Sequence, residues 1–108
     1  MDKIFNKDNE TICAVSTAAG RGGIAVIRVS GENALKFLKE LCPFIPKNPE
    51  SHRIYYGRMR EFGSDNVIDE VLVSFFARGR SYTGEQTLEI SCHGGEFVCQ
   101  KIVNELLK

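Results

Sequence analysis

The stretch TLEISC, residues 87–92, alternates strictly between polar and apolar side chains. A period of two is typical of a β-strand that buries one face and leaves the other polar. Leu88, Ile90 and Cys92 are therefore predicted to face a core, with Glu89 mid-strand on the opposite face. The simplest interpretation of Glu89 is a solvated charge. Strands disfavour glutamate, however, so Glu89 is also a candidate functional residue.

A second strand is predicted over residues 24–29, IAVIRV, where Arg28 shares a face with branched apolar residues. The opposite, core-facing side of this strand comprises Ala25, Ile27 and Val29. A guanidinium keeps its charge, so Arg28 needs a carboxylate, a ligand or a path to water. Glu89 is a candidate partner if the two strands are neighbours. The pattern fits a structural Arg28–Glu89 pair and a ligand clamp equally well.

The other elements are predicted from the same periodicities and from turn residues. They are a strand over 11–16, a glycine loop over 17–23, a helix capped by Ser30 that runs to Leu41, strands over 53–61 and 67–76 joined by the hairpin loop FGSDN, and a helix over 96–108. No element is predicted for residues 1–10. The order ββαβββα has no regular βαβ repetition, which favours an α+β fold with a mixed β-sheet and helices packed on one face.

Length and charge limit the possible functions. A chain of 108 residues is predicted to form one domain, 1–108. Its 14 basic residues balance 14 acidic ones, so no overall field attracts the phosphates of a nucleic acid. No apolar run approaches the roughly 20 residues that span a bilayer, and the polar N-terminus does not resemble a signal peptide. We expect a soluble, cytoplasmic protein that contacts no membrane.

Neither the cysteines nor the first glycine motif indicates a catalytic site. The four cysteines have irregular spacings without a Cys-x-x-Cys pair, which favours core thiols over a metal or redox site; they are Cys13, Cys42, Cys92 and Cys99. The GRGG motif at 20–23 lacks the lysine of a Walker loop and leads into a strand, so it predicts a close backbone approach rather than nucleotide hydrolysis.

Two further features have competing interpretations. The turn at His93, Gly94 and Gly95 either offers N–H groups to an anion or is a glycine turn with His93 on the surface. The second interpretation is favoured. The basic stretch that includes Arg53, Arg58 and Arg60 is a weak indication of RNA contact, against the stronger expectation of ordinary solvated strand charges.

Three ordered blocks add a family resemblance. They are TAAGRGGIAVIRVSG at 17–31, VIDEVLVSFF at 67–76 and SYTGEQTLEISCHGG at 81–95. Together they resemble the N-terminal domain of the MnmE/TrmE family of bacterial tRNA-modification GTPases, over nearly the whole chain. The resemblance implies a fold similar to the folate-binding domain of the glycine-cleavage T-protein. It also implies binding of a reduced folate, such as 5-formyltetrahydrofolate, and homodimerisation.

The resemblance further implies a larger parent protein. In this family a helical domain carries an inserted GTPase domain, which uses GTP, potassium and magnesium. With an FAD-containing partner, MnmG (GidA), the parent installs an aminomethyl or carboxymethylaminomethyl group at C5 of the wobble uridine of tRNA. The folate is then the expected one-carbon donor. Within this chain we expect no catalytic residue and no metal ligand, so the enzymatic activity belongs to the parent.

Two folate-contact positions of the family correspond to residues already identified. Arg28 is the arginine of the R-V-S-G block, and Glu89 is the second glutamate of TGE-x-x-x-E. The family's third contact, a lysine, lies beyond Lys108, and the proline that often precedes GRGG is replaced here by Ala18 and Ala19. Two alternatives stay open, namely a purely structural dimerisation module without a ligand and a tRNA-contacting domain.

Overall fold

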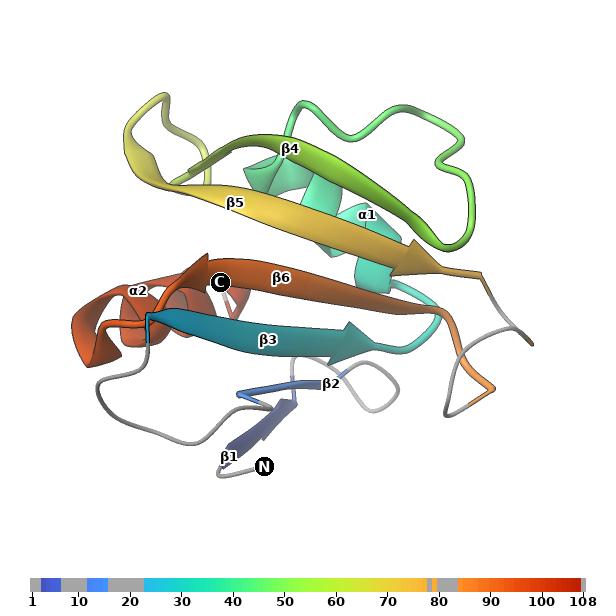
Figure 1. Ribbon diagram of the computed structural model, residues 1–108, viewed down its shortest axis with the longest axis horizontal. Coiled ribbons are helices and arrows are strands. Elements are labelled where there is room, and N and C mark those ends of the chain that lie inside the picture. Colours follow the sequence, from blue (N-terminus) through green and yellow to red (C-terminus); the bar gives the residue numbers. More distant parts are fainter. Residues whose placement is uncertain (1–2, 7–11, 16–22, 78, 80–83, 108) are drawn as a thin grey trace.

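The computed structural model describes residues 3–6, 12–15, 23–77, 79 and 84–107, which form one six-stranded sheet and two helices (Figure 1). The strands lie in the order β1-β2-β3-β6-β5-β4. In chain order the elements are β1 (Lys3–Asn6), β2 (Ile12–Val15), β3 (Ile24–Ser30), α1 (Ala34–Leu41), β4 (Arg53–Arg60), β5 (Val67–Phe76), β6 (Thr87–His93) and α2 (Glu96–Leu106).

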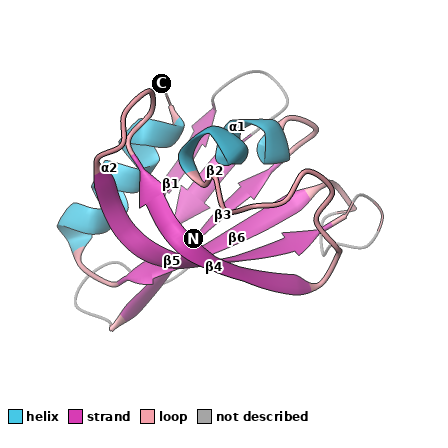
Figure 2. Ribbon diagram, turned by 90° about the horizontal axis from the view of Figure 1, so that it is seen from above, coloured by secondary structure: helices cyan, strands magenta, loops and turns pink. Residues whose placement is uncertain are grey.

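The α+β class is confirmed, and Figure 2 shows both helices on the same side of the sheet. All five strand pairings are antiparallel, so the sheet is antiparallel rather than mixed. The reason lies in the connection through α1. It leads from β3 in the middle of the sheet to β4 at the far edge instead of returning beside β3, so no parallel βαβ unit forms.

The core lies between the sheet and the helices, as the strand periodicity predicts. Ile27 on β3 and both Leu88 and Ile90 on β6 are completely buried. Leu38 of α1 and Ile102 of α2 belong to the same apolar cluster. Cys13, Cys42 and Cys92 are also buried and Cys99 is half-buried, which confirms their prediction as core thiols. None of the described helices is long and apolar enough to cross a membrane.

The first strand was not predicted. Lys3–Asn6 pairs with β2 in the register Lys3 to Val15 and forms one edge of the sheet. Its sequence, KIFN, is only four residues long and lies in a polar segment, so its periodicity is too short to indicate a strand. The backbone hydrogen bonds that define β1 come from β2, the next strand in the chain, and the side-chain pattern of a single strand does not reveal its pairing partner.

The predicted N-cap at Ser30 is wrong. Ser30 is the last residue of β3, and α1 begins at Ala34, with Asn33 at the N-cap position. The Ser30 hydroxyl donates to Oε2 of Glu85 at 3.0 Å and lies 3.3 Å from Oγ1 of Thr87 on the neighbouring strand. Gly31, with φ 133°, turns the chain after the strand, which delays the helix.

The remaining predicted elements are present with small shifts at their ends. The hairpin loop between β4 and β5 is closed by a hydrogen bond from the Glu61 amide to the Asn66 carbonyl, at 2.9 Å. Helix α2 ends at Leu106 and β6 continues to His93. The glycine loop predicted over 17–23 lies outside the described residues except for Gly23.

Candidate ligand-binding face of the sheet

Arg28 and Glu89 lie opposite each other in the register of β3 and β6, on the sheet face that the helices leave uncovered. Nη2 of Arg28 donates to Oε2 of Glu89 at 2.6 Å, and Nε donates to the same oxygen at 3.1 Å. The predicted pairing of these residues is therefore confirmed. Their side chains are 29% and 27% exposed, so the pair remains accessible to a ligand.

The pair leaves hydrogen-bonding capacity unused. The two Arg28 nitrogens that bond to Glu89, Nε and Nη2, both donate to Oε2. Oε1 of Glu89 therefore accepts no hydrogen bond from the described residues. A carboxylate can accept several hydrogen bonds, and those made by an ionised oxygen are the stronger ones. The arrangement thus presents a fixed, half-buried acceptor beside a guanidinium on the open face.

The surroundings of the pair are mostly uncharged. Ala14 of β2 lies opposite Arg28 and is 3% exposed, and Ser74 of β5 lies opposite Glu89. Further out, the same sheet face carries apolar side chains that are strongly exposed; they are Ile24, Ile54, Tyr56 and Leu72. An apolar surface of this kind marks a binding or protein-contact face.

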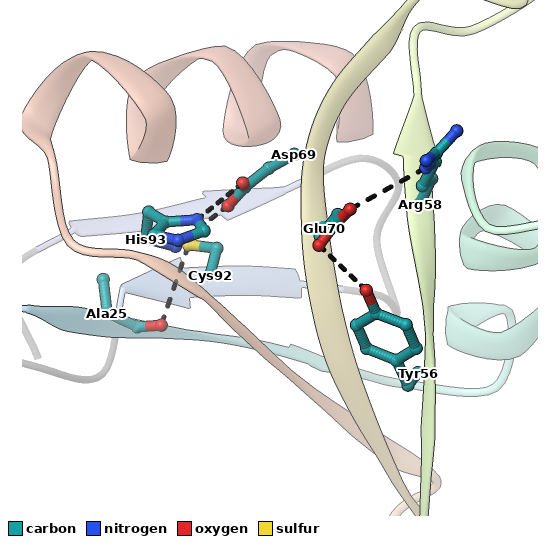
Figure 3. Close-up of polar contacts among 7 residues, drawn as sticks. All are labelled: Ala25, Tyr56, Arg58, Asp69, Glu70, Cys92 and His93. Atoms are coloured by element: carbon teal, nitrogen blue, oxygen red, sulfur yellow. Dashed lines mark hydrogen bonds and ion pairs between the residues drawn. The ribbon is translucent and has the colours of Figure 1, made fainter.

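The His93 turn is held by internal contacts. Oδ2 of Asp69 accepts from the His93 amide at 2.9 Å, and Oδ1 lies 2.7 Å from Nδ1 of the ring (Figure 3). The Gly94 amide donates to the carbonyl of Gly23 at 3.2 Å. The amides of His93 and Gly94 are therefore engaged within the protein and are not available to an anion. His93 is a surface residue with a 73% exposed side chain, as the favoured interpretation predicts.

The basic stretch does not form an unpaired positive patch. Arg53 pairs with Glu50. Nη1 of Arg60 lies 3.3 Å from Oδ1 of Asp65, and Nε of Arg58 lies 3.9 Å from Oε1 of Glu70. Each of these arginines has a carboxylate close by, which removes the field that would attract RNA phosphates. The RNA-contact interpretation therefore loses its structural basis in this stretch.

Two carboxylates at this end of the sheet were not identified from the sequence. Asp69 holds the His93 turn, and Glu70 accepts from the Tyr56 hydroxyl at 2.8 Å (Figure 3). This hydrogen bond raises the pKa of Tyr56. The sequence did offer a signal: two adjacent acidic residues lie inside a mostly apolar strand, VIDEVLVSFF. Strands disfavour acidic residues, which is also why Glu89 was a candidate.

The buried thiols are not poised as nucleophiles. Burial raises the pKa of Cys42 and of Cys92 to about 12, so both stay protonated at neutral pH. Cys92 also donates a long hydrogen bond from Sγ to the Ala25 carbonyl, at 3.7 Å. These properties suit packing rather than catalysis.

Comparison with known proteins gives a family. A family described as GTP-binding protein TrmE N-terminus matches residues 11–108. A tRNA modification GTPase MnmE from Bdellovibrio bacteriovorus is 49% identical over 102 residues, which are 94% of this chain and 21% of that relative. Proteins of the same name from Carboxydothermus hydrogenoformans and Prochlorococcus marinus are 39% and 38% identical, over 92% and 99% of the chain and 22% and 24% of their own lengths.

The chain thus spans little more than a fifth of the curated relatives that it matches. The family match includes all of β3 and β6, the two strands that carry Arg28 and Glu89. The resemblance deduced from three sequence blocks is confirmed, and the chain belongs to the TrmE N-terminal domain family of tRNA modification GTPases.

Proposed function

We propose that this chain is the module of a tRNA-modification GTPase that binds a reduced folate, of the 5-formyltetrahydrofolate type, as a one-carbon donor. The observation that carries the proposal is the Arg28–Glu89 pair. It is half-buried on an uncovered sheet face, with one oxygen of Glu89 left without a hydrogen bond from the described residues.

The chemistry of a pterin matches this arrangement. A pterin edge presents adjacent N–H donors, which a carboxylate accepts well. Glu89 would hold that edge, while Arg28 pairs with the carboxylate and donates to an oxygen of the pterin or of the formyl group. Ile24, which is exposed on the same strand and face as Arg28, would pack against the rest of the ligand.

The activity of the whole protein extends this proposal. The relatives are named tRNA modification GTPases, and the chain covers little more than a fifth of each. We assign GTP hydrolysis, with potassium and magnesium, to the rest of the parent protein. Together with FAD-containing MnmG, the parent would install the aminomethyl or carboxymethylaminomethyl group at C5 of the wobble uridine of tRNA. This reaction would take place in the cytoplasm.

Homodimerisation is the second part of the proposal. Ile54 and Tyr56 on β4 and Leu72 on β5 are 62%, 64% and 43% exposed on the open face of the sheet. Apolar side chains gathered on one face are costly to leave in water, which favours a protein contact there. Light scattering coupled to size-exclusion chromatography tests this contact. The dimeric mass of the wild type should fall to that of a monomer in Ile54→Asp/Leu72→Asp.

Calorimetric titration with 5-formyltetrahydrofolate tests the folate assignment. Glu89→Gln replaces one acceptor oxygen by a donor, so its affinity should fall about tenfold or more. Glu50→Gln is the matched control, because Glu50 also pairs with an arginine but is exposed at 67% and lies outside this site. If Arg28 and Glu89 serve stability alone, folate will bind neither the wild type nor the variants and will leave their melting temperatures unchanged.

A further inference from the structure

Two buried hydroxyls lie beside the Arg28–Glu89 pair on the same face of the sheet. Ser30 and Thr87 are directly opposite each other in the register of β3 and β6, and each lies two residues along its strand from a member of the charged pair. Both residues are 4% exposed, and their side-chain oxygens lie 3.3 Å apart. Buried hydroxyls need hydrogen-bond partners, so the partners of Ser30 and Thr87 decide how this end of the two strands is held.

Glu85 accepts from both hydroxyls. The Ser30 hydroxyl donates to Oε2 of Glu85 at 3.0 Å, and the Thr87 hydroxyl donates to the Glu85 carbonyl at 3.2 Å. A hydroxyl has one proton to donate, so both protons are used within the protein and not on a ligand. Glu85 is the first glutamate of the TGE-x-x-x-E motif, of which Glu89 is the second.

The residue after Glu85 ties the same end of the sheet to α1. The Gly31 amide donates to the Gln86 carbonyl at 2.9 Å, directly after the last residue of β3. Oε1 of Gln86 accepts from the amide of Leu35, the second residue of α1, at 3.0 Å. Amides in the first turn of a helix lack partners within the helix, so this contact fixes the helix start. Residues 85–87 thus form a clasp that joins the end of β3, the start of β6 and the start of α1.

We propose that Glu85 is a positioning residue of the candidate folate site, which holds Arg28 and Glu89 in the geometry that a ligand meets. This inference rests on the proposed function and adds to it a residue that acts through the charged pair. Strand ends open more readily than strand centres, and the pair lies only two residues from this end of β3 and β6. Opening at this end lets the two long side chains adopt other rotamers, and losing that freedom on binding lowers affinity. The clasp removes the freedom before a ligand arrives.

The first measurement needs no ligand. The Nε–H signal of Arg28 in isotope-labelled protein reports its hydrogen bond to Oε2 of Glu89, which is 3.1 Å long. Glu85→Ala removes the acceptor of the Ser30 hydroxyl, so this signal should shift and its exchange with water should rise about threefold or more, a factor typical of one hydrogen bond. Ser30→Ala removes the donor instead and leaves the exposed Glu85 to water, so it should change the same signal with little loss of stability.

Two further variants separate positioning from stability and from charge. Glu105→Ala removes a carboxylate that accepts from the Phe62 amide, so it lowers stability elsewhere and should leave the Arg28 signal unchanged. Glu85→Gln removes the charge but keeps an acceptor oxygen for Ser30, so it should rescue the Arg28 signal. In titrations with 5-formyltetrahydrofolate, Glu85→Ala should weaken binding about threefold to tenfold, and Glu85→Gln should restore most of that loss.

An Arg28 signal that is unchanged in both Glu85→Ala and Ser30→Ala would overturn the proposal. The same change in Glu105→Ala would also overturn it, because the effect would then follow from lost stability alone. A loss of folate affinity in Glu85→Gln as large as that in Glu89→Gln, with an unchanged Arg28 signal, would show that Glu85 contacts the ligand itself and does not act through the pair. If the wild type binds no folate but the Arg28 signal changes in Glu85→Ala and not in Glu105→Ala, the folate assignment fails while the positioning of the pair by Glu85 stands.

Discussion

Arg28 and Glu89 are directly paired across the antiparallel strands β3 and β6, with Nη2 and Oε2 2.6 Å apart on the uncovered face of the sheet. The two charges lie in the middle strands of the six-stranded sheet, whose positions depend on neighbours on both sides. A fixed carboxylate and guanidinium at such a position suit ligand binding, since the protein fixes their geometry before a ligand arrives.

The pair should also contribute modestly to stability. Arg28→Ala is expected to lower the free energy of unfolding by about 1–2 kcal/mol, between the values for exposed and for fully buried pairs. Urea denaturation of the two single variants and of Arg28→Ala/Glu89→Ala gives the coupling energy between the side chains. A coupling energy of about 1 kcal/mol is expected, and a value indistinguishable from zero would show that the contact contributes nothing to folding.

Gly57 is predicted to tolerate no side chain. A Cβ at this position would overlap the ring of Phe44, which is packed against the core. Gly57→Ala should therefore destabilise the protein by about 1–3 kcal/mol through overpacking, measured by urea denaturation. Gly23→Ala is the control, because a Cβ there meets no atom within 4 Å. Equal stabilities of the two variants would contradict the close contact between Gly57 and Phe44.

The buried carboxylate of Glu105 is predicted to anchor the β4–β5 hairpin to α2. Glu105 is 3% exposed, and its Oε1 accepts from the Phe62 amide at 2.7 Å. Glu105→Ala leaves that amide without its partner and should cost about 1–3 kcal/mol of unfolding free energy. Glu105→Gln keeps an acceptor oxygen and should cost less. If the glutamine variant is as unstable as the alanine variant, the hydrogen bond is not the anchor.

Stability should fall in alkaline solution because of the buried thiols. Burial raises the pKa of Cys42 from 9.0 to about 12, so the folded protein holds this proton where the unfolded chain has lost it. Between pH 9 and 12 the unfolded state binds fewer protons, and each such thiol lowers stability by up to about 1.4 kcal/mol per pH unit. Below pH 9 the two states bind the proton equally, so these thiols contribute no pH dependence.

Cys92 has a pKa raised to about 12 in the same way and is expected to add to this slope. Comparing the wild type with Cys42→Ala isolates one thiol, because other titrating groups are shared. The difference in unfolding free energy between the two proteins should shrink steadily above pH 9. A difference that is constant from pH 8 to 11 would contradict the raised pKa of Cys42.

The sequence was most informative where one pattern determines one structural feature. Alternation along β3 and β6 correctly placed Ile27 and Leu88 in the core and both charged residues on the other face. The pairing of Arg28 with Glu89 was expected only if the strands were neighbours, because periodicity assigns faces but not strand order. The antiparallel strand order of the sheet could not be predicted from periodicity either, because it depends on which edge of the sheet the connection through α1 leads to.

Contacts that depend on register were missed. The Asp69–His93 contact joins the first half of β5 to the end of β6, and a shift of one residue in either strand would break it. The strand β1 and the role of Ser30 were missed for a related reason. For Ser30 the partner is Glu85, which lies 55 residues away; for β1 it is the adjacent strand β2, and a four-residue pattern does not reveal that pairing.

The most direct test of the folate assignment is an NMR titration of isotope-labelled protein with 5-formyltetrahydrofolate, in the wild type and in Glu89→Gln. The account predicts saturable amide shifts in the wild type that are centred on Arg28 and Glu89, with a much weaker response in the variant. The measurement is repeated on the proposed full-length parent. Equal affinity of the wild type and the variant, or no response of the parent at these residues, would contradict it.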